Sequence, residues 1–361
     1  MKIMIPMWDF GKSGGQRVLA CLANSWIKLG HEVVFVVPFE TEKPYFPIEA
    51  EIYFIDWNGN KVEQKESEKR KRFPPLVFFA KMRALSAFLK KHSQYYDVVI
   101  ANYCFTSYPV AFSSKAKLNV YYIQAYEPDF FKESNGMVRR LWHKFLEFLS
   151  WLTYYLPLLR VVNSEIYQEY KNIRSENVVH PGLDFSIYYP RENSKIDPFT
   201  IGCIGRKAKF KGSDDVGEAV RLLHNSGYPV KLKVAFHPVT YVNHELVFPH
   251  GDKKLADFYR SLSVLVAPGT IQLGAVHYPV IEAMACNVPV ITTGYYPASD
   301  KNAYIVPLGS PQSIANAIIA LMNNAELASK KSSIAQKDIS HLSWENASRK
   351  FVEIMENNLI I

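Results

Sequence analysis

The first 38 residues constrain the fold more than any other part of the chain. Residues 1–8, MKIMIPMW, are short and apolar enough for a buried strand. A glycine-bearing segment, GKSGGQ, then leads into a helix-like stretch and the hydrophobic run HEVVFVVP at residues 31–38. This order of strand, Gly-rich loop, helix and strand predicts a βαβ unit in a parallel sheet.

The same alternation continues along the chain and predicts two α/β domains. Further strand patterns lie at residues 50–56, 96–102, 118–124 and 159–164, and after a polar, proline-bearing linker at residues 188–198 they resume at 199–206, 230–236, 263–268, 289–293 and 303–308. We expect an N-terminal Rossmann-like domain over residues 1–190 and a second over 191–343. Residues 344–361 are expected to form a helix that packs back on the first domain. Ligands of such paired domains bind in a shared cleft, at the carboxyl ends of the strands.

Composition favours a globular protein with anionic partners. Of 361 residues, 48% are hydrophobic, and 42 basic against 34 acidic residues give a formal charge of +8. Cys21, Cys104, Cys203 and Cys286 lie far apart without metal-ligand spacing, which indicates reduced thiols of a cytoplasmic protein. Neither a signal peptide nor a transmembrane segment is expected.

Three segments carry candidate site residues. Gly14 and Gly15 open a helix whose N–H groups would suit a phosphate or sugar, although glycines also serve a simple tight turn. The spacing matches neither a dinucleotide fingerprint nor a P-loop. In the second domain, Arg206 and Lys211 follow a strand and would stabilise a leaving diphosphate, unless this lysine-rich loop is merely solvated.

The third segment is HYPVIEAMACNVPVIT. Glu282 is expected in the first turn of a helix, where it either caps the helix or accepts hydrogen bonds from ribose hydroxyls. His277 either has a structural role or takes part in the site, and the sequence leaves both interpretations open. Gln124, Tyr126 and Glu127 follow a strand and either face the cleft or form a turn.

Together, SGGQRVLACLANSWIKLGHEV, IGRKAKFKG and HYPVIEAMACNVPVITT resemble the retaining glycosyltransferases of the GT-B fold, of the large family 4 type. The resemblance implies an enzyme that needs no metal ion or cofactor, with acceptor bound by the first domain and nucleotide sugar by the second. Arg206 and Lys211 match the basic pair on the donor diphosphate, and Glu282 matches the ribose-binding glutamate. It further implies donor contacts at Gly14, Gly15, Gly274, His277 and Tyr278, and acceptor contacts at Gln16, Gln124, Tyr126 and Glu127.

Gly274 departs from the family pattern, because most members have a glutamate at this position, eight residues before the one that matches Glu282. HYPVIEAMA and YYIQAYEPDFF are also similar to segments of bacterial rhamnosyltransferases that build surface polysaccharides. We therefore expect transfer of rhamnose from dTDP-rhamnose to a glycan or lipid-linked acceptor. The alternative is a degenerate GT-B protein that acts as a binding or scaffold subunit. The sequence shows no motif of an epimerase, of a phosphorylase or of a nucleic-acid-binding protein.

Residues 137–160 combine basic and aromatic side chains, among them Arg139, Arg140, Lys144, Trp142 and Trp151. Such a segment suits the surface of an anionic bilayer, at the inner face of the cell membrane. A core helix of the first domain is the favoured interpretation, because Glu147 and Pro157 interrupt the apolar run.

Overall fold

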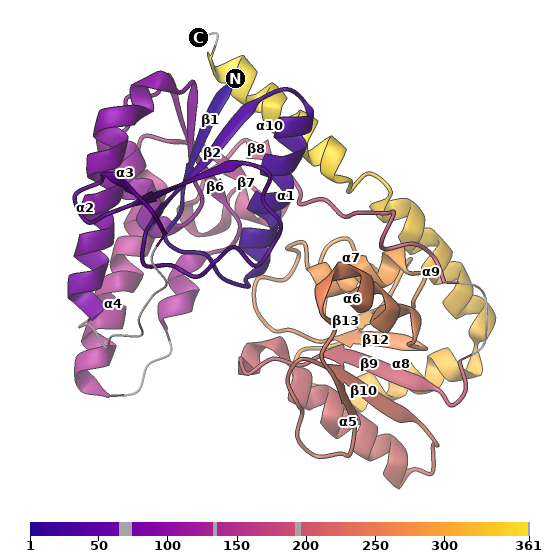
Figure 1. Ribbon diagram of the computed structural model, residues 1–361. Helices are drawn as coiled ribbons and strands as arrows, with labels where there is room; N and C mark the ends of the chain where they lie inside the picture. The colour runs from indigo at the N-terminus through magenta and orange to yellow at the C-terminus, as the bar shows by residue number, and fades with distance from the viewer. Residues whose placement is uncertain (65–73, 133–135, 192–195, 360–361) are drawn as a thin grey trace. The chain divides into compact units, whose positions relative to one another are not determined.

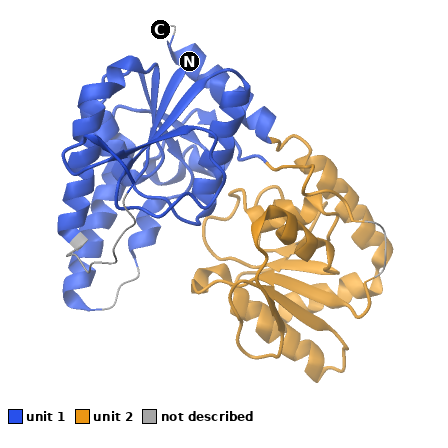
Figure 2. Cartoon of the chain, in the orientation of Figure 1, with its two compact units in different colours: residues 1–182, 344–361 blue, residues 183–343 orange. Residues whose placement is uncertain are grey.

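The parallel strands predicted from the sequence form two separate sheets (Figure 1). The computed structural model describes residues 1–64, 74–132, 136–191 and 196–359. The chain divides into unit 1, residues 1–182 and 344–361, and unit 2, residues 183–343 (Figure 2). The prediction of an α/β protein with two parallel-sheet domains is confirmed. Each unit is described by itself.

The boundary between the units falls earlier than the predicted division at residues 190 and 191. It lies between Gly182 and Leu183, because Leu183 pairs with Ser343 at the far end of unit 2. The predicted linker at 188–198 therefore begins inside unit 2, where Tyr188 is fully buried beside Tyr259. Residues 192–195 of that linker lie outside the described residues.

Unit 1 contains an eight-stranded sheet in the order β4-β3-β2-β1-β5-β6-β7-β8, in which only the β3–β4 pair is antiparallel. Its central strands are buried on both faces, which explains their continuous hydrophobic sequences. The strands are β1 (Lys2–Pro6), β2 (Glu32–Pro38), β3 (Glu51–Ile55), β4 (Lys61–Val62), β5 (Val98–Ala101), β6 (Leu118–Ile123), β7 (Leu159–Val162) and β8 (Asn177–Val178). The helices are α1 (Gly14–Lys28), α2 (Pro74–His92), α3 (Cys104–Ser113), α4 (Met137–Leu152) and α10 (Trp344–Leu359).

Unit 2 contains a six-stranded, all-parallel sheet in the order β11-β10-β9-β12-β13-β14. The strands are β9 (Thr200–Ile204), β10 (Lys231–Ala235), β11 (Glu245–Val247), β12 (Val264–Ala267), β13 (Val290–Thr292) and β14 (Tyr304–Ile305). The helices are α5 (Ser213–Asn225), α6 (Gly251–Arg260), α7 (Tyr278–Ala285), α8 (Pro311–Asn323) and α9 (Ala325–Ile339).

Each sheet has a topological switch point. In unit 2, β9 lies between β10 and β12, so the chain leaves these central strands in opposite directions. In unit 1, β1 occupies the same place between β2 and β5. Crevices at the carboxyl ends of such strands are where ligands of open α/β sheets bind. The topology alone therefore points to the loops that follow β9, β12 and β1.

The C-terminal helix α10 packs on unit 1. Phe351 is fully buried and makes edge-on ring contacts with Trp26 of α1 at 5.2 Å and Tyr122 of β6 at 5.1 Å. Met355, one turn further along, is also fully buried. A segment distant in sequence thus packs against α1 and β6.

The segment 137–160 folds as α4 followed by a 3₁₀ turn and β7, and only part of it enters the core. Leu146 and Ser150 are buried, and Trp142 packs against Phe78 of α2. Met137 and Val138, in contrast, are 82% and 78% exposed. The expectation of a core helix is therefore correct for one side of α4 alone.

We predict that Phe351→Ala lowers the free energy of unfolding of unit 1 by about 3–5 kcal/mol, because it removes a buried ring from the α10 contact. All six tryptophans of the chain belong to unit 1, so tryptophan fluorescence during denaturant unfolding reports on this unit. Glu353→Ala, on the exposed side of α10, is the control and should change little. Equal stability of the two variants would contradict the packing role of Phe351.

Candidate functional site

Glycines hold the loops after β9 and β12 of unit 2 together. Gly212 has φ +68°, and a Cβ there would collide with the carbonyl oxygen of Pro268. A Cβ at Gly205 would likewise collide with the carbonyl oxygen of His237 after β10. The backbone N–H of Thr270 donates to the carbonyl of Phe210 at 2.9 Å, which joins the same loops a second time. The carboxyl edge of the sheet is therefore a closely packed backbone platform.

This platform brings together Arg206, Lys211 and His277, three of the predicted donor-site residues. The guanidinium of Arg206 lies over the ring of Phe236 at 5.5 Å. Burial, and then the charge of Arg206, lower the pKa of Lys211. Burial, Lys211 and Arg206 in turn hold the pKa of His277 well below its ordinary value, so its imidazole is neutral near pH 7. The arrangement concentrates positive charge that an anion would offset.

His277 precedes the first turn of α7 and lies flat against Tyr295, with ring centroids 4.3 Å apart. Its carbonyl accepts hydrogen bonds from the N–H groups of Val280 and Ile281. Within the described residues, its buried Nδ1 has no hydrogen-bond partner. A helix N-terminus, two cations and a buried imidazole nitrogen therefore converge, which is the chemistry of an anion site.

The sequence predicted Glu282 in the first turn of α7. In the structure it lies in the second turn. Its side chain is only 2% exposed, and its Oε2 accepts a hydrogen bond of 2.7 Å from the hydroxyl of Tyr259. Burial together with this carboxylate raises the pKa of Tyr259. The N-terminal capping role is excluded by this position, whereas the ribose contact stays a prediction.

Gly274 and Tyr278 flank His277 at the same edge. Gly274 has φ +84°, and its N–H donates to the carbonyl of Gly294 at 2.8 Å. A side chain at position 274 would be strained in this conformation, so the glycine matches its local backbone. Tyr278 is partly buried and packs against the core of unit 2.

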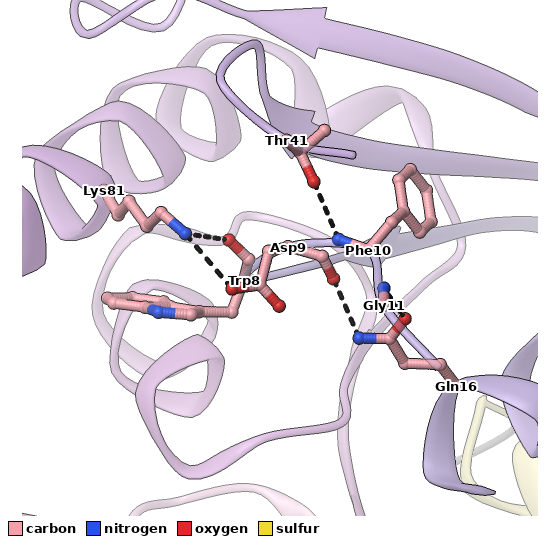
Figure 3. Close-up of polar contacts among 7 residues, drawn as sticks. All are labelled: Trp8, Asp9, Phe10, Gly11, Gln16, Thr41 and Lys81. Atoms are coloured by element: carbon pink, nitrogen blue, oxygen red, sulfur yellow. Dashed lines mark hydrogen bonds and ion pairs between the residues drawn. The ribbon is translucent and has the colours of Figure 1, made fainter. Parts of the chain in front are cut away.

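In unit 1, the loop after β1 is folded by its own polar contacts (Figure 3). Gln16 accepts a hydrogen bond from the N–H of Gly11 and donates to the carbonyl of Asp9 at 3.1 Å. The buried ammonium of Lys81 donates to the carbonyl of Trp8 at 2.9 Å and lies 3.4 Å from the carboxylate of Asp9. Gln16, predicted to contact the acceptor, thus shapes the loop itself.

Gly14 and Gly15 form the first turn of α1, as predicted. Ser13 does not cap this helix with its side chain. Gln124 donates from Nε2 to the carbonyl of Gly15 at 3.2 Å, and a Cβ on Gly15 would approach its amide to 3.3 Å. Gln124 therefore lies beside the glycine loop, at the carboxyl ends of β1 and β6.

Glu127 and Tyr126 differ from the expectation of open acceptor contacts. Glu127 is 5% exposed, and it accepts a hydrogen bond from the hydroxyl of Tyr121. Its backbone N–H donates to the hydroxyl of Tyr154 at 3.2 Å, and burial raises its pKa to about 8. Tyr126 is buried too, stacked on Tyr154 at 5.8 Å. In this structure both belong to a buried cluster.

The residues that hold the loops in place belong to no motif recognised in the sequence. Thr270 and Tyr295 fix the loop after β12, and Tyr295 also donates to the carbonyl of Ile271 at 3.1 Å. In unit 1, the hydroxyl of Thr41 accepts from the N–H of Phe10 at 2.8 Å. Their only sequence signal is a position just after a predicted strand, which many residues share.

The described residues contain no group of three or more His, Cys, Asp or Glu side chains placed to hold a metal ion. No helix within the described ranges has both the length and the apolarity that a bilayer crossing requires.

Residues 198–324 match the family model described as "Glycosyl transferases group 1". The matched segment lies within unit 2. The capsular polysaccharide biosynthesis glycosyltransferase CapM of Staphylococcus aureus is 28% identical over 172 residues, which cover 41% of this chain and 44% of CapM. The aligned part thus spans less than half of this relative.

The whole chain is similar in fold to solved structures. Sucrose-phosphate synthase from Thermosynechococcus elongatus superimposes with a TM-score of 0.75 at 14% identity, covering 99% of this chain and 98% of that one. HepE of Anabaena, solved with UDP-glucose, gives a TM-score of 0.70 at 14% identity and coverage of 99% and 100%. At such identities the likeness establishes the GT-B fold and no more.

The buried Glu127 makes a pH-dependent contribution to stability. The folded state holds its proton up to about pH 8, whereas the unfolded chain releases it near the ordinary value of 4.5. The contribution is therefore complete below that ordinary value, and it is lost as the pH rises through this range. We predict that the free energy of unfolding of Glu127→Gln, which has no proton to lose, rises relative to that of the unmodified protein as the pH increases through this range. The expected change is on the order of 1 kcal/mol per pH unit.

Denaturant unfolding followed by tryptophan fluorescence at about pH 5 and about pH 8 measures this difference. Glu63→Gln, which replaces an exposed carboxylate of the same unit, is the control. A Glu127→Gln effect that is the same at both pH values would show that Glu127 is ionised in the folded protein.

Proposed function

We propose that the protein is a retaining glycosyltransferase whose unit 2 binds the diphosphate of a nucleotide-sugar donor. The convergence of Arg206, Lys211 and His277 at the N-terminus of α7 carries this proposal. It lies at the β9–β12 switch point, within the segment that matches the group 1 family. Burial, and then the charge of Arg206, lower the pKa of Lys211, and a diphosphate would offset this buried positive charge.

In the proposed reaction, the bond between the anomeric carbon and the β-phosphate oxygen breaks while the acceptor hydroxyl attacks from the same face. The hydroxyl proton passes to an oxygen of the departing diphosphate, so no carboxylate base is needed. Arg206 and Lys211 stabilise the charge that develops on the leaving group. His277, neutral and held by Tyr295, offers Nδ1–H to a phosphate or sugar oxygen when that nitrogen carries the proton. The protein supplies orientation and electrostatics without a metal ion.

The leading candidate for the donor is dTDP-rhamnose. Most members of the resembled family have a glutamate where this chain has Gly274, so this chain offers the donor sugar no carboxylate at that position. This difference favours a donor sugar other than glucose. HepE, solved with UDP-glucose, makes UDP-glucose the main competitor. For the acceptor we propose a glycan or lipid-linked saccharide of surface polysaccharide synthesis, in accord with the name of CapM. It would contact Gln124 of unit 1, at the inner face of the cell membrane.

Thermal stabilisation and slow donor hydrolysis across a panel of nucleotide sugars test the donor. We expect dTDP-rhamnose to give the largest shift and turnover, with free nucleotides as controls. Preference for UDP-glucose would keep the transferase and discard rhamnose. Absence of binding to every donor and nucleotide would favour a degenerate scaffold protein, for which the missing glutamate at Gly274 is the supporting observation.

We predict that Arg206→Ala and Lys211→Ala each lower donor turnover on the order of a hundredfold, because each removes a charge that stabilises the leaving diphosphate. Lys209→Ala removes an exposed cation from the same loop and is the matched control. Circular dichroism checks that all three variants fold. Equal turnover in all three would show that the loop is only solvated.

A further inference from the structure

Helix α4 has two apolar sides, and the core uses only one. Trp142 and Leu149 pack in a cluster with Phe78 and Phe105, together with the buried Leu146. A second set of apolar side chains is exposed. We call this set the α4 apolar face, and it consists of Met137, Val138, Leu141, Phe145 and Phe148.

The spacing of these residues makes a continuous stripe. Leu141, Phe145 and Phe148 follow one another at four and three residues, which places them on one side of a helix with 3.6 residues per turn. Leu141 is 66% exposed and Phe148 is 55% exposed. So large an apolar surface on a folded unit costs free energy unless something covers it.

Exposed apolar side chains also lie on α2. Leu76 and Phe79 are exposed on either side of Phe78, whose ring contacts Trp142 of α4 at 5.7 Å. Figure 1 shows α2 and α4 running along the same side of unit 1. Two neighbouring helices thus contribute exposed apolar side chains.

The same helix carries positive charges. Arg139, Arg140 and Lys144 of α4 are exposed, and no ion pair joins them to another described residue. Glu147 is the one acidic residue of α4. Aromatic side chains beside lysine and arginine are typical of helices that lie in the interface of an anionic bilayer.

We propose that the α4 apolar face docks unit 1 on the surface of an anionic lipid bilayer. The 16 residues of α4 span about 24 Å, too short for a hydrocarbon core of about 30 Å, so the helix lies on the membrane rather than crossing it. A symmetric dimer through this face is disfavoured, because it would gather the cations of both copies, Arg139, Arg140 and Lys144 of each, around one interface. The proposal does not depend on donor binding by unit 2.

Co-sedimentation with vesicles of phosphatidylcholine, with and without phosphatidylglycerol, tests this docking. We expect binding to the anionic vesicles, and a loss of at least about tenfold in Leu141→Gln/Phe145→Gln/Phe148→Gln. Arg139→Gln/Arg140→Gln/Lys144→Gln should lose a similar amount. Trp142 is left unchanged because its ring packs against Phe78.

Matched controls keep the test specific. Phe248→Gln removes a ring of similar exposure from unit 2, and Lys253→Gln/Lys254→Gln/Lys301→Gln removes three exposed cations there; both should bind like the unmodified protein. Binding that survives the α4 substitutions, or no binding of the folded protein to anionic vesicles, would overturn the proposal. A dimer that the apolar substitutions dissociate would assign the face to a second copy instead. Donor turnover in solution, measured on the same variants, separates this outcome from failure of the transferase proposal.

Discussion

Backbone packing at the carboxyl edge of the unit 2 sheet is the constraint on which the candidate site depends. Gly205 and Gly212 pass so close to the carbonyls of His237 and Pro268 that neither position has room for a Cβ. Gly269 is packed as closely against Tyr295. The loops that follow β9, β10, β12 and β13 are thereby fixed against one another, and their side chains have little choice of position.

The electrostatic character of the site follows from this packing. Arg206, Lys211 and His277 come from two loops, yet each of the latter two has a pKa lowered by burial and by its cationic neighbours. Like charges held close together repel one another, and an anionic ligand that binds between them offsets this repulsion. The N-terminus of α7 adds a partial positive charge at the same place. A pre-formed site of this kind loses little entropy when a diphosphate binds.

Local pattern predicted the parallel sheets well, because buried parallel strands are continuous apolar runs that few other elements imitate. It also placed Arg206 and Lys211 after β9. It could not show that Glu127 is buried and accepts a hydrogen bond from Tyr121, or that Glu282 accepts one from Tyr259. These contacts depend on how the elements pack, which a local pattern does not contain. For α4, the pattern showed an amphipathic helix, but which apolar side enters the core depends on Phe78 of α2. Side-chain burial is decided by tertiary partners, and these were absent from the pattern.

Calorimetric titration of the protein with thymidine, dTMP and dTDP tests the central claim most directly. If Arg206, Lys211 and the N-terminus of α7 form a diphosphate site, affinity rises steeply from nucleoside to monophosphate to diphosphate, and it weakens as salt screens the charges. The same series with uridine, UMP and UDP removes dependence on the base. Equal affinity for nucleoside and diphosphate in both series would contradict the account.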